Sequence, residues 1–162
     1  MTRSTHLDPA GHARMVDVSE KAPSRRVARA SGAIRMSAEA LAAVARGELP
    51  KGDAFAVARV AGIQAAKHTP DLVPLCHPLA LDHVSIEIHP DDSLPGVRVR
   101  SEVVVTARTG AEMEALSAVA GALLSIYDMA KALDRTMSIE EVRLESKAGG
   151  RSGDWSRRGP SE

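Results

Sequence analysis

The stretch VSIEIHPDDSLPGVRVRSEVVVT, residues 84–106, decides the fold that we predict for this chain. In its first part Val84, Ile86 and Ile88 alternate with polar residues, and the second part, from Val97, alternates in the same way. Alternation with a period of two is typical of strands with one buried face. The DDSLPG segment between them has the residues of a hairpin loop. We therefore predict an antiparallel hairpin covered on one side.

Periodicity and turn residues outside this hairpin predict the other elements. Ser37 and Asp53 are good N-caps for two helices, of which the first ends at Gly47 and the second at Lys67. Further predicted elements are strands over 12–18, 25–36 and 139–147 and a long helix over 111–133. Short connections and alternating strands favour an α+β two-layer sandwich, with an antiparallel sheet covered by helices on one face.

Length and composition exclude several classes of protein. At 162 residues, the chain is predicted to form one domain over 12–155, between a flexible arm at 1–11 and a disordered tail at 156–162. Equal numbers of basic and acidic residues and 2% aromatic residues argue against a nucleic-acid partner. A lone Cys76 excludes a disulfide framework, and we find no signal peptide or membrane span. We expect a soluble cytoplasmic protein.

The predicted long helix carries the first candidate for chemistry, Asp128 with Lys131. We predict that the buried stripe of this helix contains Met113, Leu116, Ala120, Leu123, Leu124 and Tyr127. Asp128 and Lys131 are three residues apart and would be neighbours beside that stripe. One interpretation is a surface ion pair. The other is a partly dry site where the two groups exchange protons with a ligand, because burial and a close partner shift pKa values.

An apolar loop over residues 72–82 contains the segment Leu75-Cys76-His77-Pro78. Its prolines exclude it from helices and central strands, so it is either a packed loop or part of a binding site. Cys76 is a weak candidate nucleophile, because the side chains of adjacent residues such as His77 point apart in an extended loop. We predict no metal site, since the other histidines show no ligand spacing such as HExxH.

Two lysines in glycine-containing segments predict contacts with an anion. Lys51 precedes the helix start at Asp53, where free backbone N–H groups favour phosphate. Lys147 precedes the segment GGRSG, which is either an anion-binding loop or a flexible tail. Glu112 and Glu114 open the long helix, where carboxylates also interact favourably with the helix dipole. Together with the pair on the long helix, these segments suggest a site for a polyanionic small molecule and acid–base chemistry.

Several motifs, in order along the chain, resemble those of the MoaC family. They are MVDVS (15–19), KGD (51–53), AGIQAAK (61–67), LCHPL (75–79), TGAEMEAL (109–116), YDMAK (127–131) and KAGG (147–150). The resemblance runs over about residues 6–155, and the number of motifs makes it specific. The tail departs from the family pattern at Arg151, where Lys is usual.

The resemblance implies a ferredoxin-like subunit in a homohexamer, a trimer of dimers with sites at subunit interfaces. It implies a lyase that converts 3′,8-cyclo-7,8-dihydroguanosine triphosphate into cyclic pyranopterin monophosphate and pyrophosphate in molybdenum cofactor biosynthesis. No cofactor is then required, although Mg²⁺ can accompany the triphosphate. The alternatives are a non-catalytic module of the same fold that senses a nucleotide or metabolite, and a structural assembly subunit.

The resemblance also implies roles for individual residues. The catalytic Asp and Lys of the family correspond to Asp128 and Lys131. Its substrate-contacting residues correspond to Lys51, Leu75, Cys76, His77, Met113, Glu114 and Lys147. We expect Glu112 and Glu114 to hydrogen-bond the NH groups of the guanine-derived ring, and we expect Cys76 to contribute packing or a backbone contact.

Overall fold

A computed structural model of the chain describes residues 7–151 and 153–157. Along the chain the elements are β1 (Ser24–Arg35), α1 (Ala38–Arg46), α2 (Ala54–Lys67), α3 (Thr69–Leu72), β2 (His83–Asp91), β3 (Gly96–Ala107), α4 (Glu112–Ala130), β4 (Ser138–Ala148) and β5 (Trp155–Ser156). The strands form one sheet in the order β2-β3-β1-β4-β5, and every neighbouring pair is antiparallel.

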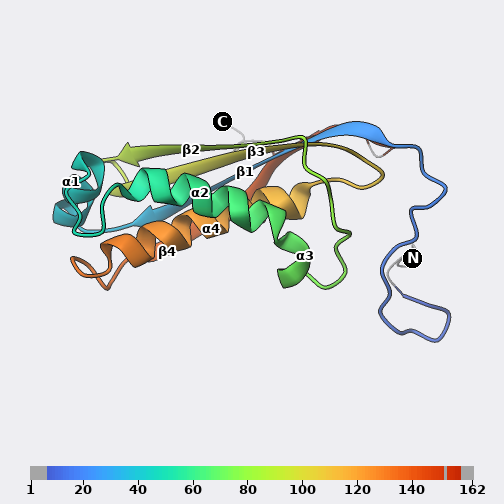
Figure 1. The fold of residues 1–162 in the computed structure, drawn as a ribbon, viewed down its shortest axis with the longest axis horizontal. Helices are drawn as coiled ribbons and strands as arrows, with labels where there is room; N and C mark the ends of the chain where they lie inside the picture. Colours follow the sequence, from blue (N-terminus) through green and yellow to red (C-terminus); the bar gives the residue numbers. More distant parts are fainter. Residues whose placement is uncertain (1–6, 152, 158–162) are drawn as a thin grey trace.

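The sheet and the helices form two layers, with α2 and α4 side by side on one face of the sheet (Figure 1). The predicted antiparallel hairpin is present as β2–β3, in which Glu87 lies opposite Arg100 and both lie on the face away from the helices. The predicted α+β sandwich with an antiparallel sheet is therefore confirmed. In this arrangement α4 runs along the sheet, so its two ends lie far apart (Figure 1).

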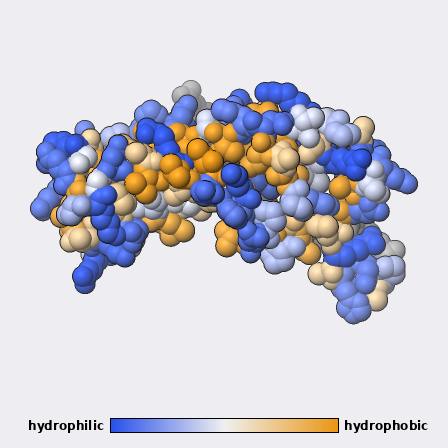
Figure 2. Space-filling view, viewed as in Figure 1, coloured by the Kyte–Doolittle hydropathy of each residue, from blue (hydrophilic) through white to orange (hydrophobic). Residues whose placement is uncertain are grey.

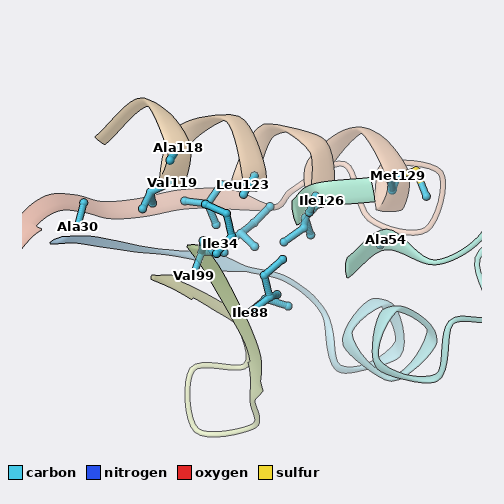
Figure 3. Close-up of a cluster of buried hydrophobic side chains, with 14 of the residues drawn as sticks. Ala30, Ile34, Ala54, Ile88, Val99, Ala118, Val119, Leu123, Ile126 and Met129 are labelled. Carbon is cyan, nitrogen blue, oxygen red and sulfur yellow. The ribbon is translucent and has the colours of Figure 1, made fainter. Parts of the chain in front are cut away.

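The core between the layers consists mainly of aliphatic side chains and alanines. Ile34 and Val99 from the sheet meet Leu123 and Ile126 from α4, and all four are fully buried (Figure 3). Gly32 in β1 allows α4 to approach closely, because a Cβ there would lie 2.8 Å from Val119 Cγ1 and 2.9 Å from Leu123 Cδ1. The small residues on both surfaces thus set the distance between helix and sheet.

The helix starts follow the predicted local signals. The hydroxyl of Ser37 accepts a hydrogen bond from Ala40 N at 3.2 Å, and the carboxylate of Asp53 accepts one from Phe55 N at 2.9 Å. Gly47 ends α1 with a φ of 67°, a left-handed conformation that favours glycine. These capping predictions are confirmed.

The strand predicted over residues 12–18 is wrong. In that segment the structure has only an isolated bridge between Leu7 and Ala13, and the segment runs away from the sheet (Figure 1). Its alternating pattern finds no strand edge to pair with, so it stays extended without a ladder. At the other end, strand pairing includes Ser156, one residue beyond the predicted domain end. Residues 1–6 of the predicted arm and 158–162 of the predicted tail lie outside the described residues.

The predicted buried stripe of the long helix is only partly right. Leu123 is buried, and Leu116 and Tyr127 are partly buried against the core, but Met113 and Leu124 are 37% and 61% exposed. The buried residues of α4, which packs on both the sheet and α2, are Glu114, Ala115, Ala118, Val119, Ala122, Leu123, Ile126, Met129 and Ala130. Alanines fill much of the buried face, and Met113 and Leu124 turn outward. By length and composition alone α4 could span a membrane, but half of its apolar window is buried, as in a core helix.

Replacing Leu123 tests this assignment of the core. Leu123→Ala should lower the free energy of unfolding by about 3 kcal/mol, because it leaves a cavity between helix and sheet. Leu133→Ala, at a leucine that is 45% exposed, should change it by less than about 0.5 kcal/mol. Chemical denaturation measures both values, and equal losses would contradict the assigned orientation of α4.

Candidate active site

The predicted site residues gather in two clusters at opposite ends of α4. Asp128 and Lys131 lie at its C-terminal end, whereas Glu112 and Glu114 lie in its first turn. A helix rises 1.5 Å per residue, so the two clusters are about 20 Å apart along the axis. One chain therefore does not bring all the predicted residues together.

The first group, which we call the lysine cluster, consists of Lys51, Asp128 and Lys131. Asp128 Oδ2 lies 2.8 Å from Lys51 Nζ, and Asp128 Oδ1 lies 2.7 Å from Lys131 Nζ. Lys51 Nζ also donates to the main-chain carbonyl of Asp128 at 3.1 Å. Hydrogen bonds from Lys131 and then Lys51, with their charges, lower the pKa of Asp128 to about 2. Asp128 is therefore a carboxylate at neutral pH.

Local structure explains how these three side chains meet. Lys51 lies in the turn between α1 and α2, where Gly52 has a φ of 93° and its N–H donates to Leu49 O at 2.9 Å. Lys131 is the C-cap of α4, where a cation interacts favourably with the helix dipole. The predicted pairing of Asp128 with Lys131 is confirmed. Of its two interpretations, the chain shows the surface ion pair and not the partly dry site, since the two side chains are 56% and 52% exposed.

The second group surrounds a cavity of about 1110 Å³, which we call the loop cavity. Its walls come from the loop after α3, the start of α4, the start of β1 and the end of β4. Among the predicted residues, the cavity is lined by Leu75, Cys76, His77, Glu112, Met113, Glu114 and Lys147. Seven of the ten predicted site residues thus line one cavity, although they come from three separate segments.

Titratable side chains lie close together in the loop cavity and affect one another's pKa values. Lys147 Nζ lies 3.0 Å from Glu112 Oε1, and both side chains are about one-third exposed. Glu114 is buried, and burial followed by the charge of Glu112 raises its pKa. Burial, then Glu114 and Glu112, raise the pKa of the Cys76 thiol. The thiol is therefore protonated at neutral pH, which disfavours a nucleophilic role.

Most of the chain is similar in sequence to one family of enzymes. The family model of the MoaC family matches residues 15–150. A cyclic pyranopterin monophosphate synthase of Chloroflexus aurantiacus is 56% identical over 153 residues, 94% of each chain. Enzymes of the same name from Methylobacterium sp. (56% over 155 residues, 96% of this chain and 97% of the relative) and Brucella ovis (54% over 151 residues, 93% and 92%) are similar.

The chain belongs to the MoaC family. The matched range includes the whole lysine cluster and every lining residue of the loop cavity except Arg151. The resemblance found in the sequence motifs is therefore confirmed.

The structure adds residues to the loop cavity of this family member that sequence reasoning did not select. They are mostly basic or from the N-terminal segment: Val16, Val18, Glu20, Lys21, Arg26, Arg108 and Arg151. Val16 and Val18 lie in the motif MVDVS. The basic residues had no distinguishing signal in the sequence, because their pattern is that of ordinary surface residues of a strand or loop. Among the described residues, no group of three or more His, Cys, Asp or Glu side chains could hold a metal ion.

The low pKa of Asp128 makes a prediction about acid stability. Because this pKa lies below the usual value of 3.8, the stabilisation from the lysine cluster is present above about pH 4 and is lost as the pH falls through about 2. Wild type and Asp128→Asn should therefore differ in stability at neutral pH and converge on acidification. In an NMR titration, Lys131→Met should raise the pKa of Asp128, whereas Lys67→Met should not. An unchanged titration in Lys131→Met would contradict the pairing.

The single cysteine allows a direct test of the charges in the loop cavity. Glu114→Gln removes a buried carboxyl that helps to raise the pKa of Cys76, so alkylation of Cys76 at pH 8 should become several-fold faster. Glu39→Gln, in the exposed first turn of α1, is the matched control and should leave the rate unchanged. Mass spectrometry measures the rate, and equal rates in both variants would refute this proximity.

Proposed function

We propose that this chain is a cyclic pyranopterin monophosphate synthase and acts as a lyase, releasing pyrophosphate from 3′,8-cyclo-7,8-dihydroguanosine triphosphate. The observation that carries the proposal is the 54–56% identity to enzymes of that name over more than nine-tenths of the chain. The basic residues of both clusters suit a triphosphate substrate, and the carboxyl groups suit a ring rearrangement by proton transfer.

A second copy of the chain completes this site. The lysine cluster and the loop cavity of one chain are about 20 Å apart along α4, farther than one nucleotide-sized substrate extends. Paired helices related by a two-fold axis would place the C-terminal end of one α4 near the N-terminal end of the other. The lysine cluster of one copy would then face the loop cavity of its partner.

The outer face of the helix layer is the surface best suited to that pairing. Val57, Val60 and Ile63 on α2 and Leu124 on α4 are 38–61% exposed. Figure 2 shows apolar side chains gathered over α2 on this face of the molecule. Contiguous apolar surface of this kind marks protein–protein contacts. We place the dimer contact here, within the trimer of dimers that the resemblance implies.

Acid–base roles follow from the pairings in the free protein. Asp128 holds both lysines of its cluster, and with a pKa of about 2 it accepts no proton in that arrangement. A triphosphate that draws Lys51 and Lys131 towards itself would raise the pKa of Asp128 and release it as a general base. Lys131 then serves as the acid partner, and Lys51 offsets the charge on the departing pyrophosphate.

The loop cavity then holds the rest of the substrate. His77 and Lys147 would orient the triphosphate, while Glu112 and Glu114 would accept hydrogen bonds from the guanine-derived ring. Met113 and the backbone of Leu75 and Cys76 would form its apolar walls. The reaction uses no resident cofactor in this proposal, any Mg²⁺ arrives with the triphosphate, and the enzyme works in the cytoplasm without nucleic-acid or membrane partners.

Incubation of the purified protein with the cyclised triphosphate tests the function. We expect pyrophosphate and cyclic pyranopterin monophosphate in equimolar amounts, detected by mass spectrometry. Asp128→Asn and Lys131→Met should each lower kcat by about 100-fold or more, because each removes a proton-transfer group. Binding of the triphosphate without chemical change in wild type would instead support the sensing module.

Mixing two inactive variants tests the shared site. His77→Ala disables the loop cavity and Asp128→Asn disables the lysine cluster, so a mixed dimer has one site with both changes and one intact site. Random pairing of equal amounts should restore about a quarter of the wild-type activity. Lys51→Ala mixed with Asp128→Asn is the matched control, since both changes lie in the same cluster and no intact site forms. Absence of recovery in the first mixture would contradict a site shared between copies.

A further inference from the structure

We propose that Arg26 is a positioning residue that fixes two loops, the one that leads into Glu112 and the one that follows Lys147. The consequences for turnover rest on the proposed function, whereas the effect on the loops does not. Arg26 lies in β1, lines the loop cavity and is half-buried. It was not among the residues that the motifs selected, because a lone arginine in a strand has no local signal.

The guanidinium of Arg26 binds the connection between β3 and α4. Its Nε donates to the carbonyl of Ala107 at 3.1 Å, and its Nη2 donates to the carbonyl of Arg108 at 3.3 Å. Both contacts join residues more than 80 positions apart along the chain. A planar fork with several donors suits two successive carbonyls, whereas the ammonium of a lysine has no such fixed geometry. The contacts hold the segment that leads directly into Glu112.

The third donor nitrogen of the same guanidinium lies against the loop after β4. Gly149 and Gly150 have φ values of 88° and 81°, which favour glycine. A Cβ on Gly150 would collide with Arg26 Nη1, and a Cβ on Gly149 would collide with the carbonyl oxygen of Arg25. The two glycines thus let the chain pass closely over Arg26, immediately after Lys147.

Arg26 therefore stands between the two segments whose side chains form an ion pair. Glu112 follows the carbonyls that Arg26 binds, and Lys147 precedes the glycines that pack on it. Lys147 Nζ and Glu112 Oε1 are 3.0 Å apart in the loop cavity. Misplacing either loop would alter this pair without removing a group that touches the substrate. The inferred action of Arg26 on catalysis is indirect and runs through Glu112 and Lys147.

Hydrogen–deuterium exchange tests the positioning role without any substrate. Arg26→Lys keeps the charge but loses the planar fork, so amide exchange should become about tenfold faster in residues 107–112 and 147–151. Arg25→Gln is the matched control, since Arg25 is adjacent and exposed, and among the described residues its side chain makes no hydrogen bond or ion pair. Equal exchange in both variants would overturn the inference.

Steady-state kinetics separates positioning from direct contact. Arg26→Lys should lower kcat by about 10- to 100-fold with KM changed less than about threefold, because displaced groups impair reaction more than binding. In a Glu112→Gln background, Arg26→Lys should lower kcat further by at most about threefold, since both substitutions act through the same ion pair of Glu112 with Lys147. A raised KM at constant kcat, or fully additive losses, would refute the indirect role. An inactive wild type would refute the proposed function, while the exchange measurement would still decide the role of Arg26.

Discussion

The close packing of α4 on the sheet is the constraint on which the rest of the structure depends. Gly32 lets α4 approach β1 closely, because a Cβ at that position would collide with Val119 and Leu123, and the buried alanines of α4 allow the same close packing. The helix is thereby fixed along its whole length, and both of its ends are placed with it. The lysine cluster and the first-turn carboxyls owe their positions to this single contact. The outward turn of Leu124 is a further consequence of the same packing.

The three lysines predicted for the candidate site each pair with a carboxylate in the free protein. Asp128 pairs with Lys51 and Lys131, and Glu112 pairs with Lys147. Under the proposed function, an anionic substrate would bind to these lysines by displacing their carboxylate partners. Such an exchange would lower the affinity for simple anions, but it would link substrate binding to a change in the protonation of the carboxyl groups. The lysine cluster keeps one excess positive charge, from Lys51 and Lys131 against Asp128, although the net charge of the whole chain is zero.

Local signals in the sequence correctly predicted the helix caps and the hairpin, because contacts between residues near each other in the chain determine these features. Ser37 and Asp53 cap their helices through contacts within three residues, and the hairpin follows from alternation. The segment at 12–18 has the same alternation but no neighbouring strand, and the outward turn of Leu124 depends on how closely the layers approach. Neither fact is encoded within a few residues, so both predictions failed.

The candidate site shows the same division. The sequence selected ten candidate side chains, yet it could not show that they fall into two groups at opposite ends of α4, because that separation is a property of the tertiary fold. Arg26 was not selected from the sequence for a related reason. Its partners are the main-chain carbonyls of Ala107 and Arg108, and a main-chain contact does not depend on residue type. A motif records which groups a site needs, whereas the backbone contacts that hold them become visible only in the folded chain.

In the proposed shared site, the separation of the two clusters would give assembly a direct role in activity. A chain whose own cavity lacks the catalytic carboxylate would be inactive alone and would become competent when a partner supplies the other half. The apolar face of α2 and α4 that would form this contact is the reverse of the surface that packs on the sheet. The helix layer thus joins two functions: its small residues build the core, and its large exposed ones build the contact that would complete the site.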